Sequence, residues 1–295
     1  MRPEPFRAAV AGGELVGAIW RADAAGTPVV AIHGITANLV SFAPLAERLD
    51  APVLALDLRG RGGSRGLPGP FGLVQHADDV AAAITAAGFA RAIVVGHSMG
   101  AFVAVRLAER HPERVERLVL VDGGLPLRPA GDGASPEDVL GPAIERLSRT
   151  FPSREAYREF WRAHPAFGPY WSPAIEAYVD ADLVEVDGAL RPSANPEAVV
   201  ANLVELDGRD GYAEALAAID APAVLLRSPR GLFDEQPGLY DDEWLAARTA
   251  SLPRLDVADV ERTNHYTILM GEGVGAVADA VTRAPALDGT HEKGR

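Results

Sequence analysis

Short apolar runs alternate along this chain with segments in which apolar residues recur every three or four positions. The runs predict buried strands, because a strand that is covered on both faces of a sheet is apolar at every position. After an opening hairpin at 6–10 and 14–20, strands are predicted at 28–32, 52–56, 93–95, 118–121, 223–226 and 255–257. The periodic segments predict helices at 41–49 (with Ser41 as its N-cap), 73–87, 101–108 and 274–281. Strand and helix in alternation are typical of a parallel sheet with helices on both faces.

Composition and charge narrow the class of protein. A formal net charge of -13 argues against nucleic acid or an anionic membrane surface as a partner. The sequence has no cysteine, so disulfides and thiolate chemistry are excluded, and its seven histidines lack the spacing of metal ligands. The glycine-rich run 59–66 matches neither common phosphate-binding pattern. We therefore expect no cofactor and no catalytic metal. Because no apolar stretch reaches about 18 residues, we also expect a cytoplasmic protein.

One short motif carries the candidate chemistry. Gly96-His97-Ser98-Met99-Gly100 is a G-x-S-x-G that follows the predicted strand 93–95 and precedes the predicted helix 101–108. A serine on such a strand-to-helix turn is exposed on a strained backbone, and the flanking glycines let strand and helix pass closely. The sequence therefore predicts a nucleophile at Ser98.

Five motifs in order make the chain resemble the α/β-hydrolase superfamily from about Val10 to about Arg283. They are 29–34, 57–64, the turn at Ser98, 118–122 and Asn264-His265. The resemblance implies a mostly parallel, doubly wound sheet, with a helical cap inserted between strands. We place the cap at 126–213, where the chain becomes proline-punctuated and aromatic, and the core at 1–125 and 214–295.

The cap range holds nine of the 19 aromatic residues of the chain. Most of them are expected to form the cap's own core, since a domain of this size must bury its apolar side chains. Substrate sites are mostly apolar and aromatic, so some should face the pocket. The candidates for substrate binding are Phe160, Trp161, Tyr170 and Trp171.

A serine nucleophile needs a base and an oxyanion hole. The resemblance implies that His265 is the base, because it alone occupies the position that the family uses. The competing histidines are His33, His76, His97, His111 and His164. The resemblance implies that His33 and His97 pack near the turn. It also implies that the backbone N–H groups of Ile35 and Met99 form the oxyanion hole.

The acid of the triad has two candidates. Many relatives carry it in a G-x-x-D turn after the strand 223–226, and here Gly231 to Asp234 lies about three residues late. Other relatives, such as haloalkane dehalogenases and zearalenone-type lactonases, carry it at the end of the preceding strand, where Asp122 stands. We favour Asp122 and keep Asp234 as the alternative.

The loop 57–64 matches a segment that the family uses structurally beside the site. Asp57, Arg59 and Ser64 are therefore expected to be structural residues. We expect Arg59 to pair with Asp57.

The resemblance implies a hydrolase that cleaves a carboxylic ester or lactone of a small, largely apolar substrate through an acyl-enzyme on Ser98. Serine at the turn disfavours C–halogen and epoxide chemistry, for which relatives need aspartate. Three alternatives stay open: a carbon–carbon bond hydrolase, a cofactor-independent haloperoxidase-like enzyme and a non-catalytic small-molecule receptor. The expected partner is a small molecule rather than nucleic acid or membrane, and the oligomeric state is left open.

Overall fold

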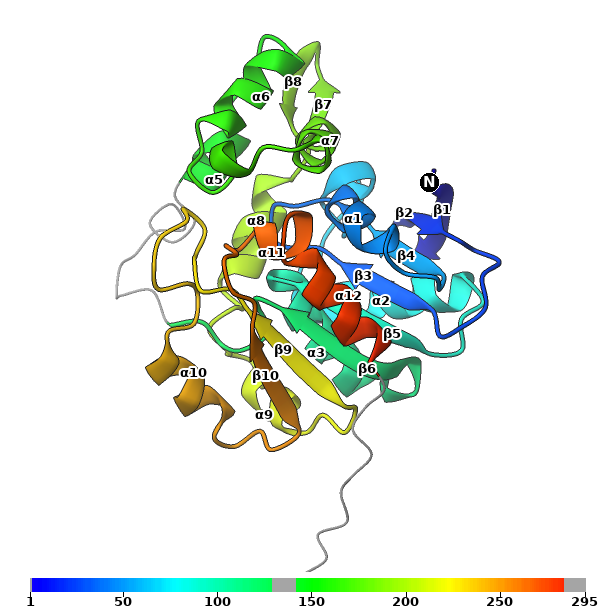
Figure 1. The fold of residues 1–295 in the computed structure, drawn as a ribbon. Coiled ribbons are helices and arrows are strands. Elements are labelled where there is room, and N and C mark those ends of the chain that lie inside the picture. Colours follow the sequence, from blue (N-terminus) through cyan, green and yellow to red (C-terminus); the bar gives the residue numbers. More distant parts are fainter. Residues whose placement is uncertain (1, 129–141, 284–295) are drawn as a thin grey trace, which may run out of the picture.

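One eight-stranded sheet forms the centre of the molecule (Figure 1). The computed structural model describes residues 2–128 and 142–283. The strands are β1 (Glu4–Val10), β2 (Gly13–Trp20), β3 (Val29–Ile32), β4 (Val53–Leu56), β5 (Ala92–His97), β6 (Val115–Val121), β9 (Ala223–Arg227) and β10 (Leu255–Asp259). Their order is β1-β2-β4-β3-β5-β6-β9-β10, antiparallel from β1 to β4 and parallel from β4 onwards. The mostly parallel sheet predicted from the sequence is thus confirmed.

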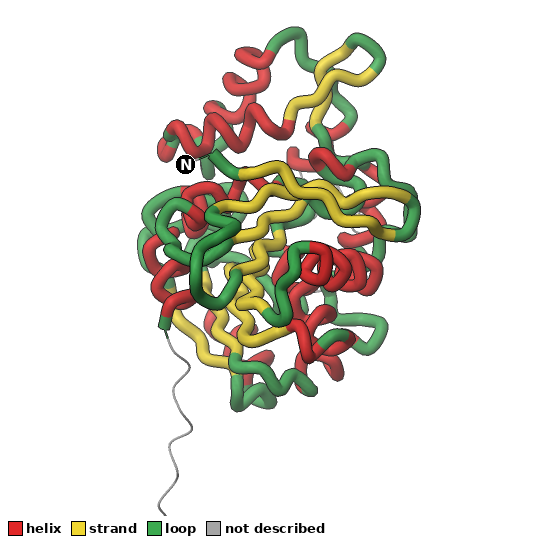
Figure 2. The backbone as a smooth tube through the Cα atoms, turned by 90° about the vertical axis from the view of Figure 1, so that its right-hand side faces the viewer, coloured by secondary structure: helices red, strands yellow, loops and turns green. Residues whose placement is uncertain are grey.

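Helices cover both faces of this sheet (Figures 1 and 2). One face packs against α2 (Leu73–Ala86), α3 (Met99–Arg110), α9 (Tyr212–Ala217) and α10 (Asp242–Thr249). The other packs against η1 (Leu39–Phe42), α1 (Ala43–Ala46), α11 (Thr267–Met270) and α12 (Val274–Thr282). Within β3, Val30 and Ile32 join the first core while Val29 and Ala31 join the second. This two-sided burial explains the unbroken apolar runs.

A second group of elements stands above the carboxyl ends of the parallel strands, at the top of Figure 1. It contains α5 (Pro142–Leu147), α6 (Arg154–Arg162), η4 (Gly168–Tyr170), α7 (Pro173–Asp182), β7 (Leu183–Val186) and β8 (Ala189–Pro192). Its apolar side chains form a third core. The following helix, α8 (Pro196–Leu203), packs Val199 against the first core instead. Residues 129–141 of the predicted cap and 284–295 of the predicted core lie outside the described part of the chain.

Two local elements differ from the sequence prediction. The cap range contains a β7–β8 hairpin, whose turn places Asp187 at φ 52° and Gly188 at φ 77°. Asp-Gly is the pair that such two-residue turns favour, so the signal was present in the sequence. The helix predicted at 41–49 is the shorter pair η1 and α1, and Asn38 rather than Ser41 caps it, accepting from the Val40 N–H at 3.0 Å. Among the described residues, no helix has the length and apolar character needed to cross a membrane.

Candidate active site

The turn between β5 and α3 holds Ser98 in a strained backbone conformation. Ser98 has φ 54° and ψ −124°, a region that residues with a side chain rarely adopt. The flanking glycines are needed because a Cβ at Gly96 would lie 2.4 Å from the Gly100 carbonyl oxygen, and one at Gly100 would lie 2.0 Å from that of Ile32. The sequence therefore folds into the tight turn that presents a serine side chain at the strand end.

His265 and Asp122 form a buried pair that is close to this turn. The Nδ1 atom of His265 lies 2.7 Å from Oδ2 of Asp122, and the side chain of Asp122 is fully buried. The other oxygen of Asp122 accepts from the Ser228 N–H at 3.0 Å. Because a carboxylate can only accept, Nδ1 carries the proton and the lone pair of the neutral ring is on Nε2. This is the tautomer that a general base at Nε2 requires.

Two further histidines pack around the strand ends, where the sequence analysis expects them. The Nε2–H of His97 donates to the His265 carbonyl oxygen at 2.7 Å, and the two rings lie 4.7 Å apart. His33 donates from Nδ1 to the Gly34 carbonyl oxygen at 2.7 Å and accepts at Nε2 from the Leu58 N–H at 3.0 Å. Burial lowers the pKa of each of these imidazoles to about 3, so both are neutral.

The backbone groups predicted to form the oxyanion hole flank Ser98 on two sides. Met99 is the first residue of α3, so its N–H has no acceptor within the helix. The loop after β3 comes close, since a Cβ at Gly34 would lie 3.1 Å from the Cβ of Ser98. Ile35 follows Gly34 directly and lines the same cavity as Ser98.

Asp234 makes a different set of contacts from Asp122. Its carboxylate accepts from the Tyr170 hydroxyl at 3.0 Å and from Nδ2 of Asn264 at 2.9 Å, and it lies 3.2 Å from Nε of Arg230. The structure thus brings Asp122, and not Asp234, against the ring of His265.

The loop 57–64 corrects one expectation about pairing. Arg59 does not pair with Asp57; it forms a bidentate ion pair with Asp79 of α2, with both distances 2.8 Å. Asp57 instead accepts from the N–H groups of Leu39 and Gly63, each at 2.8 Å. The carboxylate is thus held by backbone donors, while the guanidinium fork matches an acid on the neighbouring helix. Burial raises the pKa of Asp57 to about 6.

Ser98 and His265 line one cavity of about 110 Å³ between the strand ends and the second group of elements, α5 to β8, which we call the cap elements. Its walls are mainly apolar, with a few polar side chains near Ser98. The other lining residues are Gly34, Ile35, Thr36, Ala37, Ser41, His97, Leu127, His164, Tyr178, Leu203, Leu206, Leu232, Phe233, Leu239, Tyr266 and Met270. An enclosed apolar space with a few convergent polar groups is typical of a small-molecule site.

The four cap aromatics predicted to bind substrate are not among the lining residues of this cavity. Phe160 and Trp161 pack edge to face, 5.7 Å apart, inside the third core. Tyr170 is held by Asp234, and Trp171 lies under the Arg162 guanidinium at 4.7 Å. A small inserted group of helices needs large aromatics to fill its own core, and Trp161 is almost fully buried there. The role of the four residues in substrate binding stays a prediction.

The aromatic lining comes from residues that the sequence analysis did not select. They are His164, Tyr178, Phe233 and Tyr266. Two of these carried a signal, because Tyr266 directly follows His265 and Phe233 directly precedes Asp234. His164 and Tyr178 are in the cap, and their place depends on packing that no local pattern encodes. Burial, with the nearby Arg146 charge, lowers the pKa of His164 to about 4.

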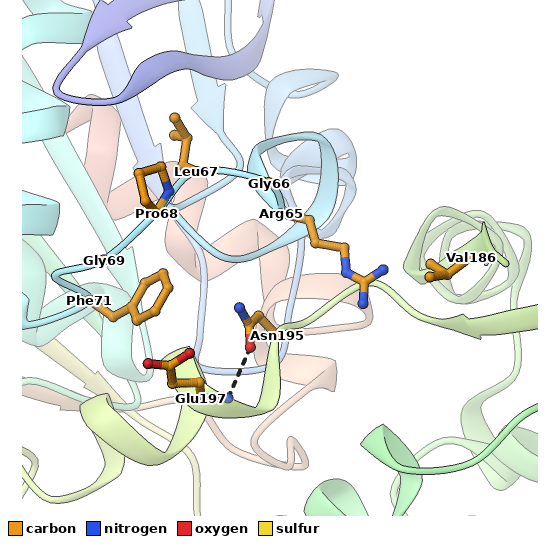
Figure 3. Close-up of a pocket in the computed structure, with 9 residues that line it drawn as sticks. All are labelled: Arg65, Gly66, Leu67, Pro68, Gly69, Phe71, Val186, Asn195 and Glu197. Carbon is orange, nitrogen blue, oxygen red and sulfur yellow. Dashed lines mark hydrogen bonds between the residues drawn. The ribbon is translucent and has the colours of Figure 1, made fainter.

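A second groove, of about 630 Å³, does not have Ser98 among its lining residues, which are drawn in Figure 3. It runs between the 65–71 loop, the start of α8 and Val186 of β7, and Asn195 caps α8 within it by accepting from the Glu197 N–H at 3.0 Å. Its lining includes none of the predicted catalytic residues. Among the described residues, no three His, Asp or Glu side chains are grouped so that they could hold a metal ion.

Comparison with known proteins places the chain in a family. Residues 27–164 match the alpha/beta hydrolase fold family. The chain is 32% identical over 200 residues to the pimeloyl-[acyl-carrier protein] methyl ester esterase of Neisseria meningitidis, covering 67% of this chain and 73% of that protein. It is 28% identical over 248 residues to the 2-(acetamidomethylene)succinate hydrolase of Mesorhizobium japonicum, covering 83% and 84%. The protein therefore belongs to the alpha/beta hydrolase family.

The same fold is found in a solved structure. The crystal structure of E-2-(acetamidomethylene)succinate hydrolase aligns with a TM-score of 0.81 at 24% identity, covering 96% of this chain and 100% of that one. The likeness extends over both the sheet and the elements above it. The predicted fold class, an α/β-hydrolase sheet, is thereby confirmed.

Proposed function

We propose that this protein hydrolyses a carboxylic ester or lactone of a small, largely apolar substrate through an acyl-enzyme on Ser98. The observation that carries the proposal is the 2.7 Å contact between Asp122 and Nδ1 of His265, beside a serine on a strained turn in the same cavity. A pair of this kind orients the imidazole and stabilises the imidazolium ion that forms during catalysis. A protein that only binds a small molecule needs neither effect.

In the proposed mechanism, Oγ of Ser98 attacks the substrate carbonyl carbon while Nε2 of His265 takes its proton. The carbonyl oxygen becomes an oxyanion that accepts from the N–H groups of Ile35 and Met99. The C–O bond to the leaving alcohol then breaks as His265 returns the proton to that oxygen. Water, deprotonated by His265, next attacks the acyl carbon. The bond to Oγ of Ser98 then breaks as His265 returns the proton to that oxygen, which releases the acid and free Ser98.

Asp122 stays ionised throughout and holds the ring by its Nδ1–H. The name of one relative, a methyl ester esterase, is consistent with cleavage of an acyl C–O bond, and another relative is named a hydrolase. The apolar walls of the cavity favour a substrate whose acyl part carries little charge.

The proposal is tested by pre-steady-state hydrolysis of p-nitrophenyl acetate. We expect a burst of p-nitrophenol equal to the enzyme concentration, followed by slower turnover, because p-nitrophenoxide is a good leaving group and acylation should then be faster than water attack on the acyl-enzyme. Ser98→Ala should be folded and show no burst. A folded Ser98→Ala protein that turns over the ester at the rate of the parent would overturn the proposal, and absence of any turnover by the parent with short esters would favour a receptor.

A further inference from the structure

Behind the predicted oxyanion hole is a buried cation whose hydrogen-bond partners are all neutral. Arg61 is fully buried and donates to the carbonyl oxygens of Arg59 at 3.0 Å and Ala198 at 3.2 Å, and to Oδ1 of Asn202 at 2.7 Å. The buried ring of His76 lies beside it, with its Nε2 atom 3.4 Å from Nη1 of Arg61. Burial and Arg61 lower the pKa of that imidazole, so it carries no charge at neutral pH. Burial lowers the pKa of Arg61 only to about 9, so the guanidinium remains charged.

The guanidinium also contacts the two residues expected to stabilise the oxyanion. Nε of Arg61 donates to the Ile35 carbonyl oxygen at 3.0 Å, and Nη2 lies 3.9 Å from the sulfur of Met99. One side chain thus reaches both the loop after β3 and the first residue of α3, which flank Ser98.

Arg61 also ties these two segments to α8. Ala198 and Asn202 are on that helix, whose last residue, Leu203, lines the cavity. The hydrogen bonds of Arg61 therefore fix the loop with Ile35 relative to a wall of the substrate cavity.

A role in packing alone does not explain why Arg61 carries a buried positive charge. Burying a cation without an acid is unfavourable, and an apolar side chain of similar volume could fill the space with less loss of solvation. The neighbouring Arg59 shows the usual solution, since it is equally buried but paired with Asp79. A fixed positive charge in a low-dielectric interior does, however, stabilise negative charge that appears nearby during a reaction.

We propose that Arg61 is a positioning residue for the oxyanion hole. It holds Ile35 through its carbonyl oxygen, so that the N–H of Ile35 faces the reacting carbonyl, and its charge favours the oxyanion over the neutral bound ester. The inference rests on the proposed serine mechanism at Ser98. It predicts an effect on the chemical step rather than on substrate binding.

The test compares Arg61→Lys and Arg61→Met with Arg59→Lys as the matched control. kcat and KM are measured on p-nitrophenyl acetate, with a thermal melting curve for each variant. Affinity is measured for a short trifluoromethyl ketone, which forms an anionic adduct with a reactive serine, and for the corresponding methyl ketone, which resembles the ground state.

We expect Arg61→Lys to lower kcat about tenfold and Arg61→Met about 100-fold, with KM within about twofold, because loss of one oxyanion-hole donor costs about 10²–10³ in kcat. Affinity for the trifluoromethyl ketone should fall in the same proportion, and affinity for the methyl ketone should not change. Arg59→Lys should melt at a lower temperature but keep kcat within about twofold.

Folded Arg61 variants with the parent kcat would overturn the inference, as would an equal loss of kcat in Arg59→Lys. If Arg61→Met does not fold, the tenfold loss of kcat expected for Arg61→Lys becomes the test, because this variant keeps the charge and one donor and should fold. Ser98→Ala separates the two proposals. An inactive Ser98→Ala beside fully active Arg61 variants refutes only the role of Arg61, whereas an active Ser98→Ala refutes the serine mechanism itself.

Discussion

The hydroxyl of Tyr170 and the carboxylate of Asp234 lie 3.0 Å apart, and this contact joins the cap elements to the loop that follows β9. The same carboxylate accepts from Asn264, whose Oδ1 in turn accepts from the N–H groups of Tyr266 and Thr267 at 3.0 and 2.9 Å. Asn264 also donates to the Ala166 carbonyl oxygen at 3.1 Å. The contacts of Asp234 thus hold the cap elements and the His265 loop together.

Asp122→Asn and Asp234→Asn should separate these two carboxylates. We expect Asp122→Asn to be folded with kcat lowered about 10⁴-fold, since the comparable change in the Ser-His-Asp proteases favours the wrong tautomer. Asp234→Asn should keep kcat within about tenfold, a barrier change of about 1.4 kcal/mol. It should also melt at a lower temperature, because it weakens contacts to Tyr170 and Arg230. Steady-state kinetics on one p-nitrophenyl ester with melting curves measure both; a dead Asp234→Asn beside an active Asp122→Asn would reverse the assignment.

Acyl-chain selectivity should respond to Leu206 and not to Phe160. Leu206→Ala enlarges the cavity, so the ratio of kcat/KM for p-nitrophenyl hexanoate over acetate should rise about tenfold. Phe160→Ala removes a ring from the third core and should lower the melting temperature with the ratio within about twofold of the parent. A selectivity change at Phe160 and none at Leu206 would instead support the predicted role of the cap aromatics in substrate binding.

Alanine substitutions at two glycines should have opposite effects on stability. Gly100→Ala places a methyl group 2.0 Å from the Ile32 carbonyl oxygen, so strand and helix must separate and we expect little folded protein. Gly275 in α12 faces open space, and Gly275→Ala should raise the free energy of unfolding by up to about 1 kcal/mol. Urea unfolding of both variants checks this pair. A Gly100→Ala protein as stable as the parent would contradict the close approach at the Ser98 turn.

Buried neutral histidines should make the protein less stable in acid. His33 and His97 have pKa values lowered from 6.5 to about 3, so below pH 6.5 the unfolded chain binds protons that the folded protein does not. Their contribution to the free energy of unfolding is therefore fully present above pH 6.5 and is lost as the pH falls below that value. Asp57 has the opposite effect, because its raised pKa of about 6 lets the folded protein bind a proton before the unfolded chain does. Between about pH 6 and 4 it therefore raises the free energy of unfolding as the pH falls and offsets part of the loss.

His33→Gln isolates one of these contributions. The loss of unfolding free energy between pH 7 and pH 5 should be about 2 kcal/mol smaller in this variant than in the parent. Urea unfolding at the two pH values measures the difference. An unchanged pH dependence would show that His33 does not resist protonation in the folded protein.

Much of the core could be predicted because its signals are local. Apolar runs such as 93–95 are buried on both faces, and the glycines around Ser98 are required by contacts with the nearest strand. The positions of Asp122 and His265 follow from the same logic, since side chains that follow parallel strands meet at one edge of the sheet.

The cavity walls could not be predicted because they depend on tertiary packing. Whether an aromatic residue of the cap fills its own core, as Trp161 does, or lines the pocket, as Tyr178 does, depends on how helices cross, and both side chains are almost fully buried. The pairing of Arg59 with Asp79 is similar, because it joins residues 20 positions apart on a loop and a helix. Composition and periodicity carry no information about either choice.

The size of the cavity beside Ser98 sets a limit on the substrates that can enter it without deformation. At about 110 Å³ it is smaller than an engineered apolar cavity of about 150 Å³ that binds benzene. Under the proposed function, an acetyl or propionyl group, which is smaller than benzene, fits this space, whereas a longer chain has to push back Leu203 and Leu206 or the ring of Tyr178. Preference for acyl-chain length is then set by how easily the structure deforms, because a long acyl group fits only if helix α8 and the cap elements move apart.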